Sequence, residues 1–163
     1  MVAQINQEVI EDAHLEDFLF GANRISTEPI RRSLRELQRN RCFYCGDPLR
    51  GPTAVDHFLP WARHPNNGIH NLVVADARCN GYKRHFLAAA PHVAQWSDRM
   101  ARQSDQLSEI ARDCAWENHR DRTLNVARAV YLRLPDHAML WSSRRDFVPV
   151  ERAALTRALD RVQ

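Results

Sequence analysis

Apolar and polar positions change their period along the chain. Residues 4–20 and 27–40 carry apolar side chains at helical spacing, and Thr27 followed by Pro29 suits the start of the second helix. Residues 41–75 have short patterns rich in Gly and Pro, with two strand candidates, TAVDHF and NLVVA. The pattern therefore predicts two helices followed by a small, turn-rich sheet.

The remainder of the chain, from Asp76 onward, has a helical pattern. Asp76 is placed to cap the first of these helices, and Cys114 falls at a helix junction where a small buried side chain would fit. The apolar stripes on these helices indicate core rather than partner surfaces. We expect helices from Asp76 to Leu87, from His92 to about Asp113, up to Pro135, and from near Pro149.

Length and composition are those of one globular unit. The chain has 163 residues and a mass of 18.9 kDa, with 44% hydrophobic and 26% charged residues. No apolar run reaches the roughly 18 residues of a membrane span, and the N-terminus lacks a basic region followed by an apolar one. We expect a cytoplasmic protein without a signal peptide or membrane contact.

Charge is distributed unevenly along the chain. The net charge is +3, and residues 41–90 carry six basic against three acidic groups, whereas residues 1–40 carry five against seven. Lys83 is the only lysine and lies within the basic middle segment. A net charge of this size does not by itself indicate nucleic acid, so the motifs of the middle segment must decide.

Two cysteines at the start of the middle segment stand close together. Cys42 and Cys45 form a C-x-x-C pair that runs directly into Gly-Asp-Pro, which is turn chemistry. A thioredoxin-like redox site would instead open a helix after a buried strand. In an intracellular protein this spacing, with Cys79 further along, favours a zinc knuckle over disulfides.

Polar residues with catalytic potential follow this knuckle. Asp56 and His57 adjoin each other on a predicted strand, where neighbouring side chains point to opposite sides. A carboxylate can hold a divalent metal, and an imidazole, with an ordinary pKa of about 6.5, can accept a proton from water. These are two functions that phosphodiester hydrolysis needs. Asn71, Asn80 and Lys83 complete the set.

In this order and spacing, the segments CFYCG, VDHFLPW and HNLVVADARCNGYKRHFLAA resemble the HNH endonuclease family, which is built on a ββα-metal finger. The resemblance covers about residues 41–90. It implies that Asp56 and Asn80 bind a catalytic ion, that His57 is the general base, and that Asn71 pins the loop that orients His57. The family signature ends in His; the oxygen of Asn80 suits a hard cation, Mg²⁺ or Mn²⁺.

The resemblance also implies a structural zinc (Zn²⁺) site that takes no part in cleavage. Many HNH proteins carry a second C-x-x-C, but the first position of that pair is Asp76 here. Three alternatives stay open: Asp76 completes the site, a nearby histidine such as His64 or His85 does so, or the site binds zinc weakly. The thiolate ligands would be Cys42, Cys45 and Cys79.

Residues after the expected ion ligand Asn80 are candidates for substrate binding. Lys83 and Arg84 lie one turn further along and, together with His85, would contact phosphates that flank the cut. Trp61 is expected to pack over the finger rather than to stack on a base.

We expect an α+β fold in which a small ββα-metal core at residues 41–90 is embedded in a mostly helical protein. Helices at residues 1–40 and 91–163 would pack with it as one unit. The predicted activity is metal-dependent hydrolysis of DNA phosphodiester bonds, with double-stranded DNA as partner and a homodimer through the helical flanks. Two alternatives stay open: an RNA-cleaving nuclease of the same type, and a non-catalytic zinc module that binds nucleic acid or protein.

Overall fold

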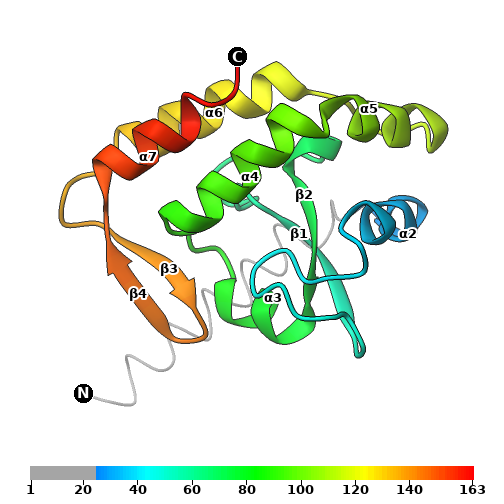
Figure 1. Cartoon of the computed structure of the whole chain (residues 1–163), viewed down its shortest axis with the longest axis horizontal. Coiled ribbons are helices and arrows are strands. Elements are labelled where there is room, and N and C mark those ends of the chain that lie inside the picture. The colour runs from blue at the N-terminus through cyan, green and yellow to red at the C-terminus, as the bar shows by residue number, and fades with distance from the viewer. Residues whose placement is uncertain (1–24) are drawn as a thin grey trace.

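The computed structural model describes residues 25–163 (Figure 1), so the helix expected at residues 4–20 lies outside the described part. The chain combines helices with two separate pairs of strands, which confirms the α+β class. The elements are α2 (Glu28–Leu37), β1 (Thr53–His57), the 3₁₀ turn η1 (Ile69–Asn71), β2 (Leu72–Asp76), α3 (Ala77–Lys83), α4 (Ala90–Arg102), α5 (Ser104–Asp113), α6 (Arg120–Leu132), β3 (Met139–Ser143), β4 (Asp146–Pro149) and α7 (Arg152–Leu159).

The first strand pair and the helix after it form a compact ββα unit. β1 and β2 are antiparallel, with Asp56 opposite Val73 and His57 opposite Leu72. The strand–strand–helix order is as predicted. The cap at Asp76 is also as predicted, because the Asp76 side chain accepts a hydrogen bond from the Arg78 backbone N–H at 2.8 Å. α3 is shorter than predicted and ends at Lys83, where the next residue takes a positive φ of 48°.

The helix expected from His92 to Asp113 is two helices. The chain bends at Gln103, between α4 and α5. Ser104 explains the bend, since its Oγ lies 3.0 Å from both His70 Nε2 and Arg120 Nε and so holds the chain to two other elements. Tertiary polar contacts therefore override a continuous helical pattern here.

The prediction that the chain stays helical after Asp76 is wrong at residues 139–149. These residues form the β3–β4 hairpin, with Leu140 opposite Val148 and Trp141 opposite Phe147. Their strands are short and their turn lacks the Gly or Asn that signals a hairpin in a sequence. The side chains of Leu140 and Trp141 are both buried, so the strand shows no apolar–polar alternation.

One hydrophobic core joins the ββα unit to the helices. Phe58, just after β1, stacks on Trp96 of α4 with ring centroids 5.0 Å apart and nearly parallel planes. α7 packs along α4, and its Leu155 and Leu159 are fully buried (Figure 1). Within residues 25–163 no helix is both long and apolar enough to cross a membrane.

Candidate active site

Asp56, the predicted ligand of the catalytic ion, is held by two side chains. Its Oδ2 accepts a hydrogen bond from the hydroxyl of Tyr44 and lies 3.0 Å from the ammonium Nζ of Lys83. Asp56 is only 9% exposed and Lys83 is fully buried. A carboxylate in such surroundings is tolerated because both partners satisfy it.

Lys83 connects the two catalytic candidates at the end of β1. Besides the ion pair with Asp56, its Nζ donates to the backbone carbonyl of His57 at 3.0 Å. It also lies 5.7 Å from the centre of the Tyr44 ring. This position differs from the phosphate-binding role expected of Lys83, because a fully buried ammonium is out of reach of a phosphate at the surface.

Tyr44 is a site residue that the sequence analysis missed. Burial and the neighbouring Asp56 carboxylate raise the pKa of Tyr44 well above its ordinary value, so its hydroxyl stays protonated and donates to Asp56. An aromatic residue inside a C-x-x-C knuckle indicates packing beneath the turn. Nothing in the sequence shows where its hydroxyl points.

His57 ends β1 and is half-buried, one position after the buried Asp56. Its Nε2 lies 2.9 Å from Oδ1 of Asn67, and its ring meets Trp61 edge to face at 5.4 Å. The expected packing role of Trp61 thus has a specific partner, the imidazole itself. Asn67 was not expected, because the path of the loop after β1 decides which of its polar residues reaches the ring.

Asn71 holds the loop between β1 and β2. Its Oδ1 accepts from the Leu59 backbone N–H at 2.8 Å, and its Nδ2 donates to the carbonyls of Leu59 and Asn66, both at 3.1 Å. Asn71 is fully buried. These contacts close the loop from Leu59 to Asn71, which carries Asn67, the residue next to the His57 ring.

Asn80 lies half-buried on α3, three residues before Lys83. Residues three apart share one face of a helix, so Asn80 lies on the face that Lys83 directs toward Asp56. Arg84 and His85 follow the helix and are both exposed, with the His85 ring against Phe86 at 4.8 Å.

The knuckle brings three cysteines together. The sulfur atoms of Cys42, Cys45 and Cys79 all lie within 4.8 Å of one another. Burial and the two neighbouring thiols raise the pKa of Cys79, so the cluster suits a cation that takes up thiolate charge. Zinc fits this donor set, since it prefers sulfur ligands in tetrahedral sites.

The candidate fourth zinc ligands do not join this cluster. In residues 25–163 no Asp, Glu or His ligand atom lies within 4.8 Å of all three sulfurs. Asp76 is close by, since its backbone N–H donates to Cys42 Sγ at 3.3 Å, but its carboxylate caps α3. The hydrogen bond from the Arg78 N–H lowers the pKa of Asp76. The fourth ligand stays a prediction.

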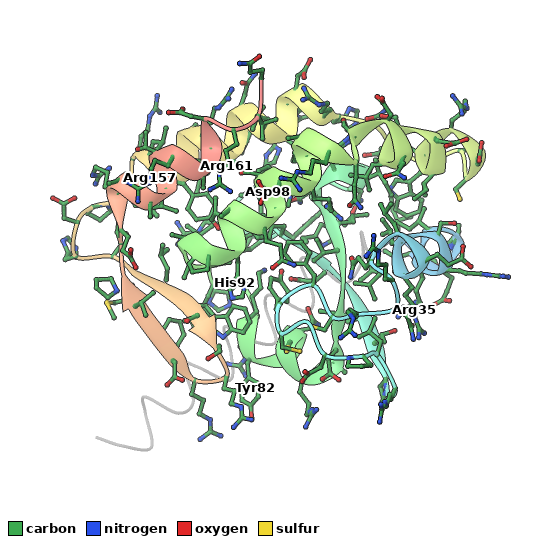
Figure 2. All side chains as sticks on the ribbon, viewed as in Figure 1. Arg35, Tyr82, His92, Asp98, Arg157 and Arg161 are labelled. Atoms are coloured by element: carbon green, nitrogen blue, oxygen red, sulfur yellow. The ribbon has the colours of Figure 1, made fainter. Side chains whose placement is uncertain are left out.

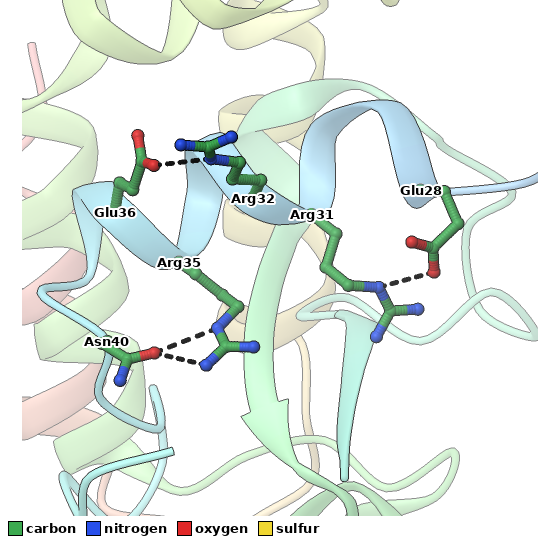
Figure 3. A pocket seen from close by; sticks show the side chains of 6 residues that line it. All are labelled: Glu28, Arg31, Arg32, Arg35, Glu36 and Asn40. Carbon is green, nitrogen blue, oxygen red and sulfur yellow. Dashed lines mark hydrogen bonds and ion pairs between the residues drawn. The ribbon is translucent and has the colours of Figure 1, made fainter. Parts of the chain in front are cut away.

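The residues that line a surface pocket at α2 include none of the candidate catalytic or zinc-binding residues (Figure 3). Two of its arginines are paired with carboxylates, Arg31 with Glu28 at 2.8 Å and Arg32 with Glu36 at 2.9 Å, and Arg35 donates a hydrogen bond to the side-chain oxygen of Asn40. We therefore place the candidate active site at the ββα unit and not in this pocket.

Comparison with known families agrees with that placement. Residues 42–89 match the model of the HNH endonuclease family. The resemblance to HNH endonucleases is confirmed over this segment. The HNH segment contains Asp56, His57, Asn71 and Asn80, and the match supports a nuclease function.

Among solved structures, the chain is similar to the Type II-C Cas9 enzyme from Actinomyces naeslundii. The identity is 25% and the TM-score 0.40, over 69% of this chain and 13% of that one. The chain thus spans a small part of the length of that enzyme. No curated protein matches the chain.

Proposed function

We propose that this protein is a metal-dependent endonuclease that hydrolyses DNA phosphodiester bonds. The observation that carries the proposal is the arrangement at the end of β1, inside the HNH segment. There Asp56 and His57 lie on opposite sides of the strand, and each is held by partners of its own. Such pre-positioned side chains are typical of active sites.

Asp56 and Asn80 would hold a Mg²⁺ or Mn²⁺ ion, because carboxylate and amide oxygens suit hard cations. Both protein contacts of the carboxylate engage Oδ2, so Oδ1 is the oxygen we assign to the ion. When bound, the ion would offset negative charge on the phosphate and on the leaving 3′ oxygen.

His57 would accept the proton of the attacking water, while Asn67 and Trp61 keep its ring in place. Lys83 holds both Asp56 and the backbone of His57, so we assign it as a positioning residue. The products would carry 5′-phosphate and 3′-hydroxyl ends. Zinc on the cysteine cluster would stabilise the fold without taking part in cleavage.

Plasmid cleavage tests the proposal. Supercoiled DNA is incubated with the protein and Mg²⁺, Mn²⁺ or EDTA, and RNA of matching sequence is treated in parallel. We expect His57→Ala to cleave about 10²- to 10⁴-fold more slowly, the usual cost of a lost general base. His137→Ala removes an exposed histidine outside the HNH segment and should cleave like the wild type. Equal cleavage by the wild type and His57→Ala would overturn the assignment.

One observation favours the alternative of a non-catalytic zinc module. The Lys83 ammonium already neutralises Asp56, as in a purely structural ion pair. Calorimetric titration with Mn²⁺ in the presence of bound zinc separates the two functions. The nuclease requires a Mn²⁺ site that Asp56→Asn weakens, whereas the zinc module has no such site.

A further inference from the structure

The β3–β4 hairpin lies outside the HNH segment and ends in a turn of two arginines. Arg144 and Arg145 are both exposed, between the paired residues Ser143 and Asp146. Arg144 has a φ of 45°, a conformation that two-residue hairpin turns normally give to Gly. A long cationic side chain at a position that favours Gly indicates that the side chain itself has a function.

The turn is fixed to the candidate active site. The buried indole of Trp141 donates from Nε1 to the Arg144 carbonyl at 3.0 Å. The same indole meets the Tyr44 ring edge to face at 5.2 Å, and the Tyr44 hydroxyl holds Asp56. The two arginines therefore project from a rigid support that also positions the proposed ion ligand.

α3 contributes to the same surface. β3 contacts α3, and Figure 2 places the labelled Tyr82 beside the turn end of the hairpin. Tyr82 is 38% exposed, and Arg84 is exposed with a φ of 48°. The segment that follows α3 packs against the hairpin, because the ring of Phe86 meets the ring of Phe147 edge to face at 4.8 Å.

The charge of this surface is positive. Arg84, Arg144 and Arg145 outnumber the exposed Asp146, and the ammonium of Lys83 is buried and paired with Asp56. Arginine guanidinium groups form paired hydrogen bonds with phosphate oxygens, and an exposed aromatic ring can stack on a base. Three exposed arginines and one exposed tyrosine thus fit a nucleic-acid backbone better than an apolar protein surface.

We propose that the β3–β4 turn, together with Arg84 and Tyr82, binds the phosphodiester backbone that flanks the bond in the candidate active site. This inference rests on the proposed function for the position of that bond. It assigns substrate binding to a hairpin outside the family segment.

The test is binding of a fluorescent duplex DNA by anisotropy, in EDTA and with zinc kept bound, so that cleavage is absent. The variant Arg144→Gly with Arg145→Ser removes both charges and relieves the positive φ, so its melting temperature should not fall. We expect about tenfold weaker binding and a salt dependence reduced by about two, since each phosphate contact contributes roughly 0.9 to the slope. Affinity and slope equal to those of the wild type would overturn the inference.

A matched control removes two exposed arginines elsewhere. Arg102→Ser with Arg157→Ser has the same change of charge on α4 and α7, and Figure 2 shows Arg157 in the upper part of the view, with Tyr82 at the lower edge. It should bind more tightly than the turn variant. An equal loss of DNA affinity in both variants would show that the effect comes from net charge alone and would overturn the inference.

Two further arms separate this inference from the proposed function. Duplex RNA and single-stranded DNA of the same length show whether the loss of affinity expected with duplex DNA extends to other polymers. If the wild type binds DNA through the turn but does not cleave plasmid, the nuclease proposal fails, and backbone binding by the turn stands without a cleaved bond beside it. If cleavage requires His57 but the turn variant binds normally, this inference fails alone.

Discussion

Two strand pairs in the described part of the chain are stabilised by different sets of side-chain contacts. β1 and β2 are joined by a long loop, and buried polar contacts of Asn71 and Lys83 hold that loop and the strand end. β3 and β4 are joined by a two-residue turn, and aromatic packing of Trp141 and Phe147 holds them against the rest. Side-chain polar contacts are thus prominent at the first pair and aromatic packing at the second, where the Trp141 indole also donates to the Arg144 carbonyl and His92 Nε2 lies 2.6 Å from the Ser142 carbonyl oxygen.

Polar contacts and aromatic packing contribute differently to side-chain orientation and to stability. Buried hydrogen bonds and ion pairs contribute little net stability, but they fix where a side chain points. Aromatic packing contributes more stability and less direction. Polar contacts thus hold the Asp56 carboxylate and the backbone of His57, and aromatic packing supports the β3–β4 pair.

Removal of the buried cation should have the largest effect. Lys83→Met leaves the Asp56 carboxylate buried without its ion pair, and we expect a loss of about 3–5 kcal/mol in the free energy of unfolding. Urea unfolding with zinc present measures it. Arg102→Met, an exposed control, should change stability by less than about 0.5 kcal/mol.

A second substitution sharpens this result. Lys83→Met combined with Asp56→Leu removes both charges, so most of the lost stability should return. If Lys83→Met alone is as stable as the wild type, the buried ion pair between Lys83 and Asp56 does not stabilise the first strand pair.

Substitution of Asn71 should have the next largest effect on stability. Asn71→Ala leaves the backbone groups of Leu59 and Asn66 without their buried partner, at a cost of about 2–4 kcal/mol. The loop then loses its hold on the His57 ring, so the cleavage rate should fall while the affinity for DNA stays unchanged. The exposed Asn125→Ala is the control. A variant that is destabilised but cleaves at the normal rate would limit Asn71 to a structural role.

The pH dependence of stability tests the same loop. Burial and the nearby Arg99 and Arg120 lower the pKa of His70 to about 4, against the opposing effects of the hydrogen bond with Ser104 and of the Asp121 charge. The unfolded chain binds the proton first, near pH 6.5, so the stability that neutral His70 contributes is present above pH 6.5 and is lost as the pH falls toward 4.

The size of this effect follows from the shift. Between pH 6.5 and 4, the free energy of unfolding of the wild type should fall by up to about 3 kcal/mol more than that of His70→Gln. Unfolding in urea at a series of pH values measures the difference. His64 and His92, whose pKa values burial also lowers, titrate in both proteins, so their contributions cancel. Parallel curves for the two proteins would contradict the prediction.

The sequence predicted the elements whose signals are local. The two strands of the ββα unit, the cap at Asp76 and the helix that became α2 each depend on neighbouring residues, and all three are present. The β3–β4 hairpin was missed because Arg144 occupies a turn position that sequence rules reserve for Gly or Asn. The bend at Gln103 was missed because it depends on His70 and Arg120, which are distant in sequence.

The candidate site shows a similar limit. Motif spacing selected Asp56, His57 and Asn71, and their chemical roles stay predictions. The burial of Lys83 was not foreseen, since lysine is almost always exposed unless it is paired. Its contact with Asp56 and the contact of His57 with Asn67 arise only when the chain closes on itself, so spacing does not reveal them.

Two tryptophans offer the finest test of the contrast between the strand pairs. The Trp116 indole donates to the Asn67 carbonyl at 2.6 Å, in the loop beside His57, and the Trp141 indole donates to the Arg144 carbonyl at 3.0 Å, in the other turn. Replacement of either by Phe removes one hydrogen bond and keeps most of the packing, so each should cost about 1 kcal/mol. Their functional effects should differ, because one carbonyl belongs to the loop beside His57, the proposed general base, and the other to the β3–β4 turn. Trp116→Phe should slow cleavage with unchanged DNA affinity, and Trp141→Phe should weaken binding in EDTA. If both variants change the same quantity, orientation and substrate binding are not divided between the two strand pairs.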